Sequence, residues 1–424
     1  MLDVLTPDET LELIKKEFAH IKPQHETVEL CAAVGRVLYE DVAATEYVPG
    51  FDRSTVDGYA VKAADTFGCS DAIPAILQVA GKVLMGEEAD MTLAEGQCCA
   101  VPTGGAVPQG ADSVVMIEYT EDYGDGTVGI GKAAAPGQNM IFKGDDVFPG
   151  KTILKKGRRL SSQDIGALAA IGKAQVTVAK KPRIAVISTG DELVYPAETP
   201  TAGQVRDVNG ALLSAMLTSF GAEPVEFGII KDNEDELRNA VSAAVQSCDG
   251  VLLSGGSSVG EKDAAAKVIG SLGDMLLHGI AMKPGKPTIL GCKGNKPILG
   301  VPGYPVSGII VIEELLRPLV DICMGRGKAA YQTAEAVLTR PVVSGLKYQE
   351  FVRVRLGRVG DKLTASPLNR GSGVVSSFMK ADGILEVPQG REGYEAGEKV
   401  SFFAAALPAR CTAADTLLSR PAAL

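Results

Sequence analysis

Residues 249–269 read Asp-Gly-Val-Leu-Leu-Ser-Gly-Gly-Ser-Ser-Val-Gly-Glu-Lys-Asp-Ala-Ala-Ala-Lys-Val-Ile. The apolar start predicts a short buried strand, and the residues from Asp263 onward predict the opening of a helix. A strand that enters a helix through a glycine-rich turn leaves backbone N–H groups free, and such a turn favours anions. Glu261 and Asp263 stand beside this turn, where two acids suit a bridging divalent cation. The alternative is that both acids cap the helix and favour its dipole.

Strands and helices alternate in the sequence before this turn. We expect strands at 184–187 and 225–230 and helices at 211–220 and 235–246. This alternation predicts a parallel sheet wrapped by helices, whose ligands bind beyond the carboxyl ends of the strands. Three polar segments that follow strands should therefore converge at one edge of the sheet: Ser188-Thr-Gly-Asp-Glu192, Lys231-Asp-Asn233 and Ser254-Gly-Gly256.

Two later segments are expected at the same edge. They read Lys283-Pro-Gly-Lys-Pro287 and, after a predicted strand at 297–300, Val301-Pro-Gly-Tyr-Pro-Val-Ser307. The two lysines could pair with phosphate, but they do not form a Walker A motif because proline follows the second lysine. The alternative is a surface turn with solvated charges.

The N-terminal part begins with a helix that Thr6 caps, followed at 49–61 by a loop rich in Pro, Gly and short polar residues. The alternative for this loop is a hairpin turn at Asp57-Gly58. Dense turn signals between 62 and 142 predict a small all-β domain. Within it, the Gly-x-Gly-x-x-Gly string at 124–129 is interpreted as a turn, because no helix follows it.

The C-terminal part is predicted to be a small β-barrel. The stretch Phe351-Val-Arg-Val-Arg-Leu356 alternates between apolar and charged side chains from Val352 onward, which is typical of a half-exposed strand. Turn residues separate the short apolar runs that follow. The tail from about Arg410 is rich in Ala, Ser and Thr, and we expect it to be loose.

Composition limits the class of protein. A chain of 424 residues predicts two to four domains, and a net charge of -10 argues against non-specific nucleic-acid binding. The longest apolar stretch, 309–320, is interrupted by charges and a proline, so no membrane span is expected. The first residues lack a signal-peptide pattern. The 8 scattered cysteines and 3 histidines do not suggest a zinc site, and we expect reduced thiols in a cytoplasmic protein.

Together these segments resemble the molybdopterin molybdenumtransferase family, which includes MoeA-type proteins and the matching domain of gephyrin. The resemblance covers the chain from about residue 3 to residue 406, and it is the order of the motifs that makes it specific. The motifs are Phe51-Asp-Arg-Ser-Thr-Val-Asp-Gly-Tyr-Ala60, Pro102-Thr-Gly104, Gly144-Asp-Asp146, Ser188 to Glu192, Ser254 to Gly260 with Asp263, Lys283 to Pro287 and Pro302 to Ser307.

The resemblance implies a multidomain α/β plus β architecture. A central doubly wound parallel-sheet domain would span 179–326, and an inserted small β domain would span 46–142. Residues 1–45 and 143–178 would form an elongated linker and dimerisation domain. Residues 327–424 would form the C-terminal β-barrel with its loose tail.

The resemblance also implies a reaction and its participants. The chain would insert molybdate into the dithiolene of adenylyl-molybdopterin, with Mg²⁺ and with release of AMP. It would act as a cytoplasmic homodimer with each site between two subunits, and other proteins of molybdenum cofactor biosynthesis would be further partners. Neither nucleic acid nor a membrane is implied.

Matching positions imply the residues of the site. The catalytic residues would be Asp57, Thr103, Asp146, Glu192, Asp232 and Asp263, of which Asp263 and Glu192 would bind the metal ion. The substrate-binding residues would be Ser254, Gly255, Gly256, Ser258, Gly260, Lys283, Lys286, Pro302, Pro305, Arg353 and Ser372, the last two from the partner's barrel.

The sequence departs from the family pattern at three positions. Arg53 replaces an Asn, Ser257 replaces a Val, and Tyr304 replaces an Asn. Arg53 adds a cation near an anionic site, and Tyr304 exchanges an amide for an aromatic face. None of the three removes an acid or a lysine of the motifs.

Three other functions remain as alternatives. A molybdopterin adenylyltransferase would resemble 179–326 alone, and the parts outside that range argue against it. A non-catalytic molybdopterin-binding scaffold or carrier would not need the acids that this sequence retains. A homologue that inserts tungstate is the third alternative.

Overall fold

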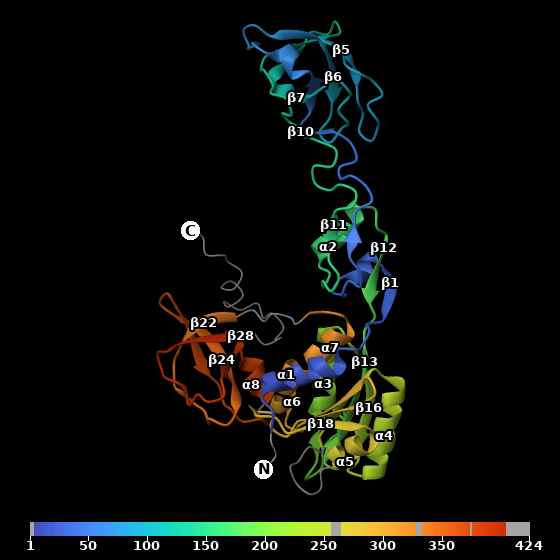
Figure 1. Cartoon of the computed structure of the whole chain (residues 1–424). Coiled ribbons are helices and arrows are strands. Elements are labelled where there is room, and N and C mark those ends of the chain that lie inside the picture. The colour runs from blue at the N-terminus through green and yellow to red at the C-terminus, as the bar shows by residue number, and fades with distance from the viewer. Residues whose placement is uncertain (1–3, 256–263, 328–332, 374, 404–424) are drawn as a thin grey trace. The chain divides into compact units, whose positions relative to one another are not determined.

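The computed structural model describes residues 4–255, 264–327, 333–373 and 375–403, and Figure 1 shows their course. The chain forms two compact units. One consists of Met1–Glu26, Gly35–Tyr39 and Val178–Leu424, and the other of Thr27–Val34 and Glu40–Thr177. We call them unit 1 and unit 2 and describe each by itself.

Unit 1 contains a six-stranded mixed sheet. Four of its strands are parallel neighbours, in the order β16 (Glu223–Ile230), β13 (Arg183–Thr189), β17 (Gly250–Ser254) and β21 (Lys296–Val301). Antiparallel strands β20 (Ile289–Lys293) and β18 (Asp274–His278) complete it. The predicted parallel sheet is thus confirmed for four strands. The antiparallel pair was not foreseen, because Lys293-Gly-Asn-Lys296 is a tight turn that folds β20 back on β21.

Helices cover both faces of this sheet, so it is doubly wound. In β13, Ile184 and Val186 join the core on one face, whereas Ala185 and Ile187 join the core on the other. This separation follows from the strand, in which successive side chains point to opposite faces. The flanking helices are, on the first face, α1 (Pro7–Phe18), α3 (Val208–Phe220) and α7 (Arg317–Cys323), and on the second, α4 (Glu234–Ser247) and α5 (Ala264–Leu272).

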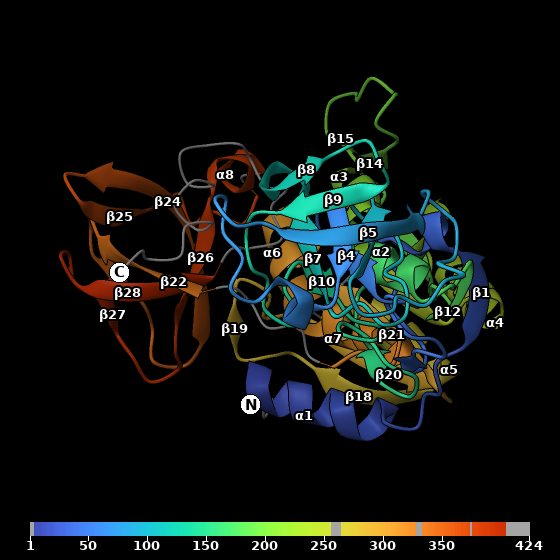
Figure 2. The same cartoon turned by 90° about the horizontal axis from the view of Figure 1, so that it is seen from above.

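The C-terminal strands of unit 1 close into a barrel, as predicted. Their cyclic order is β24 (Gln349–Val359), β25 (Lys362–Pro367), β22 (Thr333–Leu338), β28 (Lys399–Phe403) and β26 (Gly383–Val387), and β26 pairs again with β24. Figure 2 shows these strands around their common interior. Val352, Val354 and Phe402 belong to the core that fills it.

The prediction that 351–356 forms a half-exposed strand is wrong. Residues 350–354 of β24 are all buried. Val352 and Val354 face the barrel interior, but Phe351 packs on the outside of the barrel in the same core as α3 and α7. The alternating pattern is present in the sequence, yet both faces of the strand are covered. The predicted loose tail lies outside the described residues.

Unit 2 contains a second six-stranded sheet. Its order is β7 (Ser113–Met116), β4 (Gly58–Val61), β6 (Gln97–Val101), β5 (Ala75–Lys82), β9 (Thr127–Ile130) and β8 (Thr120–Asp122). The glycine string at 124–129 connects β8 to β9 as a turn and enters β9, in line with the sequence prediction. Unit 2 also contains the α-helix α2 (Ser162–Ala170).

The alternative of a hairpin turn at Asp57-Gly58 is wrong. Gly58 begins β4, between β6 and β7. A Cβ atom at Gly58 would lie 1.9 Å from the carbonyl oxygen of Val115, so the strands approach more closely than any side chain would allow. The preceding strand β3 (Arg53–Ser54) pairs with β10 (Met140–Ile141) instead of with β4.

Candidate functional site

The carboxyl ends of the parallel strands in unit 1 bring the predicted loops together. The Thr189 hydroxyl donates to Asp232 Oδ1 over 2.9 Å, which joins the loop after β13 to the loop after β16. The backbone N–H of Asp232 in turn donates to Asp191 Oδ1 over 3.3 Å. These two hydrogen bonds confirm that the loops after β13 and β16 lie side by side, as expected.

The first residues of the glycine-rich turn lie between the same strands. The N–H of Gly255 donates to the Val301 carbonyl over 3.2 Å, at the end of β21. Its φ of +98° is in the left-handed region, and a Cβ atom there would lie 2.3 Å from the Thr189 carbonyl oxygen. Only glycine fits this position. The predicted site residues Gly256, Ser258, Gly260 and Asp263 lie outside the described residues.

Asn209, near the start of α3, was missed by the sequence analysis. Its amide nitrogen donates to Ser254 Oγ over 2.7 Å and to the Gly303 carbonyl over 2.9 Å. Asn209 thereby connects the turn after β17 with the proline-containing segment after β21. Its buried Oδ1 atom has no hydrogen-bond partner among the described residues. The one sequence pattern that could have drawn attention to Asn209 is Asp207-Val-Asn-Gly210, in which Asp207 caps α3.

Exposed carboxylates gather at this edge. Asp191, Glu192 and Asp232 are all exposed and lie at the ends of adjacent strands. Carboxylate oxygens are the ligand type that Mg²⁺ prefers. Within the described part of the chain, however, no three acids, histidines or cysteines are grouped closely enough to hold a metal ion. The donor chemistry fits the expected ion, and the second expected ligand, Asp263, is not described.

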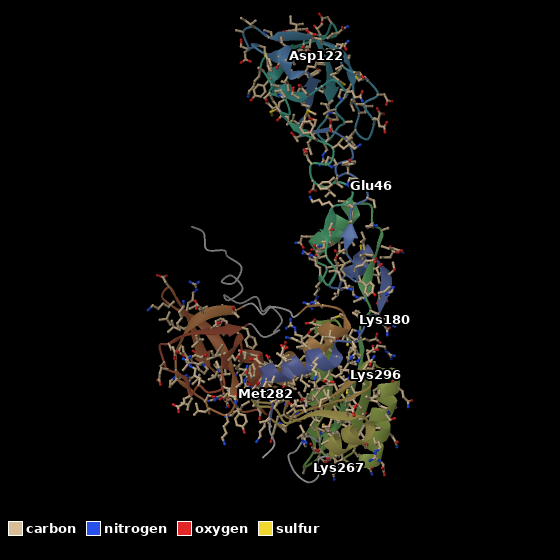
Figure 3. The ribbon with its side chains drawn as sticks, in the orientation of Figure 1. Glu46, Asp122, Lys180, Lys267, Met282 and Lys296 are labelled. Atoms are coloured by element: carbon tan, nitrogen blue, oxygen red, sulfur yellow. The ribbon has the colours of Figure 1, made fainter. Side chains whose placement is uncertain are left out.

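Lys283 is held by a buried carboxylate of the barrel. It lies in β19 (Met282–Lys283), which pairs in parallel with β24 and whose Met282 is labelled in Figure 3. Lys283 Nζ is 3.7 Å from Glu350 Oε1, and Glu350 is only 2% exposed. Glu350 also accepts hydrogen bonds from Arg370 and from Ser344 Oγ. The lysine is therefore anchored at a defined place, although its side chain stays largely exposed.

The other predicted lysine of this segment, Lys286, lies over the ring of Tyr348, with Nζ 5.7 Å from the ring centroid. It is exposed. Both lysines thus contact the segment that leads into β24 or the strand itself. Both lysines are exposed, so the alternative of a surface turn with solvated charges stays open beside these contacts.

The proline-containing segment leads into α6 (Pro305–Val311) and contacts the barrel loop 369–373. The N–H of Val306 donates to the Ser372 carbonyl over 3.2 Å within the same chain. Ser372 therefore contacts the segment Pro302 to Ser307 within its own chain, and a contribution of its side chain to a partner's site stays a prediction. Tyr304 is 63% exposed beside Gly373, so the aromatic side chain stands at the surface of this edge.

Arg353 is buried beneath the same barrel loop. It is 4% exposed, and burial lowers its pKa. Its Nη2 donates to the carbonyl oxygens of Asn369 and Gly371, over 2.5 and 3.4 Å, and the guanidinium lies over Phe378. In this chain Arg353 supports the backbone of the loop that carries Ser372.

Unit 2 holds a second cluster of predicted site residues. Asp57 Oδ1 accepts a hydrogen bond of 2.8 Å from the backbone N–H of Thr103, so these two residues lie together. The N–H of Gly104 donates to the Ser54 carbonyl over 2.8 Å, which locks the two loops to each other. Both Asp57 and Thr103 are exposed. Their side chains are available to a ligand in spite of the rigid backbone between them.

Asp146 lies in a neighbouring loop of unit 2. Its N–H donates to the Val48 carbonyl over 3.2 Å, and its own carbonyl accepts from Lys151 Nζ over 2.6 Å. The N–H of Lys143 donates to Asp52 Oδ1 over 2.8 Å, which ties the loop of Asp146 to the loop of Asp57. The side chain of Asp146 is exposed.

Arg53 is half-buried in β3, where it pairs with Ile141 and forms a bridge to Ala106. Asp52 and Asp57, the acids of its own loop, accept from the backbone N–H groups of other loops. Among the ion pairs of the described residues, none includes Arg53. The geometry thus gives no support to a role in bracing this loop through an ion pair.

Comparison with known proteins covers nearly the whole chain. Residues 5–172 match the family model described as the MoeA N-terminal region, domains I and II. Residues 185–321 match the "probable molybdopterin binding domain", and residues 335–404 match the MoeA C-terminal region, domain IV.

Individual relatives match at similar length. A molybdopterin molybdenumtransferase of Bacillus subtilis is 32% identical over 407 residues, covering 94% of this chain and 94% of the relative. One of Haemophilus influenzae is 32% identical, covering 89% and 93%. Two solved structures of the molybdopterin biosynthesis protein MoeA from Pyrococcus horikoshii have TM-scores of 0.83 and 0.82, with 37% and 30% identity. Each covers 95% of this chain, and the coverage of the solved chains is 99% and 100%.

Proposed function

Because this chain belongs to the molybdopterin molybdenumtransferase family, we propose that it inserts molybdate into the dithiolene of adenylyl-molybdopterin and releases AMP. The observation that carries the proposal is the meeting of the loops after β13, β16, β17 and β21 at one edge of a sheet, together with Lys283, which pairs with the buried Glu350. The reaction belongs to molybdenum cofactor biosynthesis.

The described residues divide the work between anion binding and positioning. Lys283 and Lys286 supply positive charge for the phosphate groups, whose charge rises as the anhydride bond breaks. Asp57, Asp146, Glu192 and Asp232 act as acids that position water or a metal ion. Thr103 presents a hydroxyl group, a donor suited to a tetrahedral oxyanion such as molybdate.

Magnesium is part of the proposal. Glu192 and Asp263 would hold it, and the exposed carboxylates around Asp232 are compatible with that role. When bound, Mg²⁺ neutralises charge on the phosphate oxygens. Without it, the acids near Ser254 and Gly255 would repel an anionic substrate.

The alternatives are weaker on particular observations. A molybdopterin adenylyltransferase would need only the central domain, whereas the N-terminal and C-terminal family models both match here. A scaffold would not require exposed acids at the sheet edge. A homologue that inserts tungstate would use the same site with a different oxyanion. The single-turnover assay below compares molybdate with tungstate and so distinguishes the two.

We further propose a cytoplasmic homodimer, in which two subunits contribute to each site, built from the domains 1–45 with 143–178, 46–142, 179–326 and 327–424. None of the helices in the described part of the chain has the length and apolar character that spanning a bilayer requires. Interaction with other proteins of cofactor biosynthesis belongs to the same proposal.

A single-turnover assay tests the function. The purified chain is mixed with adenylyl-molybdopterin, Mg²⁺ and either molybdate or tungstate, and AMP and metal-loaded pterin are measured. The proposal expects AMP release that depends on molybdate. Binding of the pterin without AMP release would identify a carrier. Formation of adenylyl-molybdopterin from molybdopterin and ATP would identify an adenylyltransferase.

A further inference from the structure

Unit 1 has a pocket of about 450 Å³ at the edge of the sheet opposite the candidate site. Its walls include Pro182, Asp249 and Lys296, which stand at the amino ends of the parallel strands β13, β17 and β21. Because these strands are parallel, their amino ends and their carboxyl ends lie at opposite edges. The pocket is therefore separate from the loops that carry the proposed reaction.

Positive side chains dominate this pocket. Lys22 follows α1, Lys180 and Lys181 precede β13, and Lys296 begins β21, so three separate segments supply four lysines. Figure 3 labels Lys180 and Lys296. Asp249 is the single acidic residue of the lining among the described residues. Such a concentration is unexpected in a chain with a net charge of -10.

Most of these ammonium groups are not used by the fold. Lys296 Nζ donates to the Val245 carbonyl over 2.6 Å. Lys22, Lys180 and Lys181 are exposed, and no ion pair of the described residues includes any of them. Placing like charges around one concavity is unfavourable unless an anion neutralises them. A solvated surface would more often place acids between them.

The walls and floor between the lysines are defined by other contacts. His20 Nε2 and Asn295 Oδ1 are 2.8 Å apart, which fixes one wall. Asp249 Oδ2 accepts from the Arg183 backbone N–H over 2.8 Å, so this carboxylate is partly satisfied. Cys323 contributes to the lining, and burial, followed by the nearby Asp249 carboxylate, raises the pKa of its thiol to about 12. The thiol is therefore neutral at pH 7.

We propose that this pocket binds a small molecule that carries at least two phosphate groups. This site is distinct from the site of the proposed molybdate transfer. Lysine ammonium groups bind phosphate as point charges. The volume is within the range of ligand pockets. Ile21 and Pro182 offer apolar surface to the organic part of a phosphate ester. The inference does not rest on the proposed function, because it uses residues of the opposite edge.

Pyrophosphate is the first probe, titrated calorimetrically into the full chain at low ionic strength. The double variant Lys180→Ala/Lys181→Ala should weaken its binding tenfold or more, and a higher salt concentration should weaken binding to the unchanged chain. Lys362→Ala removes an exposed lysine of the barrel hairpin and is the matched control. Lys283→Ala reports any pyrophosphate bound at the candidate site.

The outcomes separate clearly. Loss of one binding event in the double variant, with Lys362→Ala unchanged, supports the pocket, and any second binding event that is lost only in Lys283→Ala belongs to the candidate site. The proposal is overturned if pyrophosphate does not bind to the unchanged chain. It is also overturned if Lys283→Ala weakens binding tenfold or more while the double variant binds as tightly as the unchanged chain. Lys22→Ala repeats the test if the double variant does not fold. Replacing pyrophosphate by fructose 1,6-bisphosphate tests the organic part: weaker binding of the ester than of pyrophosphate would restrict the site to inorganic polyphosphate and overturn the ester assignment.

Discussion

Arg53 lies in the two-residue strand β3, in a segment that is held together through backbone hydrogen bonds. Its guanidinium offers a planar fork of donors that suits a tetrahedral oxyanion. We expect Arg53→Asn to raise the molybdate concentration for half-maximal insertion roughly tenfold, which corresponds to about 1.4 kcal/mol of lost interaction. The dependence on adenylyl-molybdopterin should hardly change. Both dependences are measured in the steady state.

The control is the thermal midpoint of the same variant. If Arg53 only braces its loop, Arg53→Asn lowers that midpoint and leaves the molybdate dependence unchanged, which would remove the oxyanion role. Arg53→Lys keeps the charge but loses the fork. It should recover part of the affinity for molybdate if the contact is bidentate.

At the scale of single elements, α2 offers a pH-dependent test of stability. Ser161 and Asp164 form a capping box, and Arg158 donates to the Asp164 carboxylate over 2.9 Å. Burial of Asp164 opposes its ionisation, but the hydrogen bonds from Arg158 and Ser161 outweigh it and lower its pKa. A lowered pKa contributes stability above the unfolded pKa of about 3.9, and this contribution is lost as the pH falls through the folded pKa.

Asp164→Asn should therefore lower the free energy of unfolding by about 1 to 2 kcal/mol at pH 7. The difference in the free energy of unfolding between Asp164→Asn and the unchanged chain should become smaller as the pH falls below about 4. Urea unfolding at several pH values measures it. Asp361→Asn, on the exposed hairpin between β24 and β25, is the control, and an equal effect of both substitutions at all pH values would contradict the assignment.

Glu350 in β24 connects two loops of the candidate site. Its carboxylate is buried between Lys283 and Arg370, and Arg370 belongs to the loop 369–373 that reaches Val306 through Ser372. Glu350→Gln keeps the shape of the side chain but removes its charge and leaves one acceptor oxygen where the carboxylate offers two. We expect a loss of about 1 to 3 kcal/mol in stability, since Arg370 remains partly exposed to water.

The kinetic readout distinguishes positioning from a purely structural role. Release of Lys283 from its anchor should raise the KM for adenylyl-molybdopterin several-fold, whereas the molybdate dependence should remain. Glu335→Gln, which removes an exposed carboxylate paired with Lys399 in the same barrel, is the matched control. Unchanged KM in Glu350→Gln, measured where the variant is fully folded, would leave Glu350 with a structural role only.

The elements also differ in how far the sequence could predict them. The alternation of strands and helices around 184–254 identified the doubly wound sheet, because each segment carries its own periodicity. The half-exposed strand predicted at 351–356 was wrong, because the sequence does not show that an outer face of the barrel is covered. Asn209 was missed because its two partners, Ser254 and Gly303, are distant in sequence and meet only through the parallel register. Gly255, in contrast, was identified because a glycine-rich turn directly after a strand is a local pattern that needs no distant partner.

At the scale of the whole molecule, the predicted site residues divide between the two units: Asp57, Thr103 and Asp146 lie in unit 2, and the described others lie in unit 1. If two subunits contribute to each site, mixed dimers of Asp57→Ala and Lys283→Ala chains should regain activity. One site of each heterodimer then has a full set of residues. Activity is measured after mixing and separation of differently tagged heterodimers.

Each homodimeric variant provides the baseline, and each should be almost inactive. Heterodimers that form but gain no activity over these baselines would contradict a shared site. Complementation by Asp57→Ala with Thr103→Ala should fail, because these residues contact each other in one unit and would fall in the same half of the site.

The discontinuity of unit 1 has a consequence for synthesis on the ribosome. Leu11, Ile14 and Phe18 of α1 are buried, and the core that receives Ile14 and Phe18 includes Leu319 and Val320 of α7. About 300 residues must therefore be made before α1 finds its place, which takes roughly 15 to 60 s at common elongation rates. Unit 2 is complete long before that, since it ends at Thr177. The apolar face of α1 is thus a natural binding site for chaperones during this interval, and the nascent chain should be most prone to aggregation between the release of unit 2 and the emergence of α7.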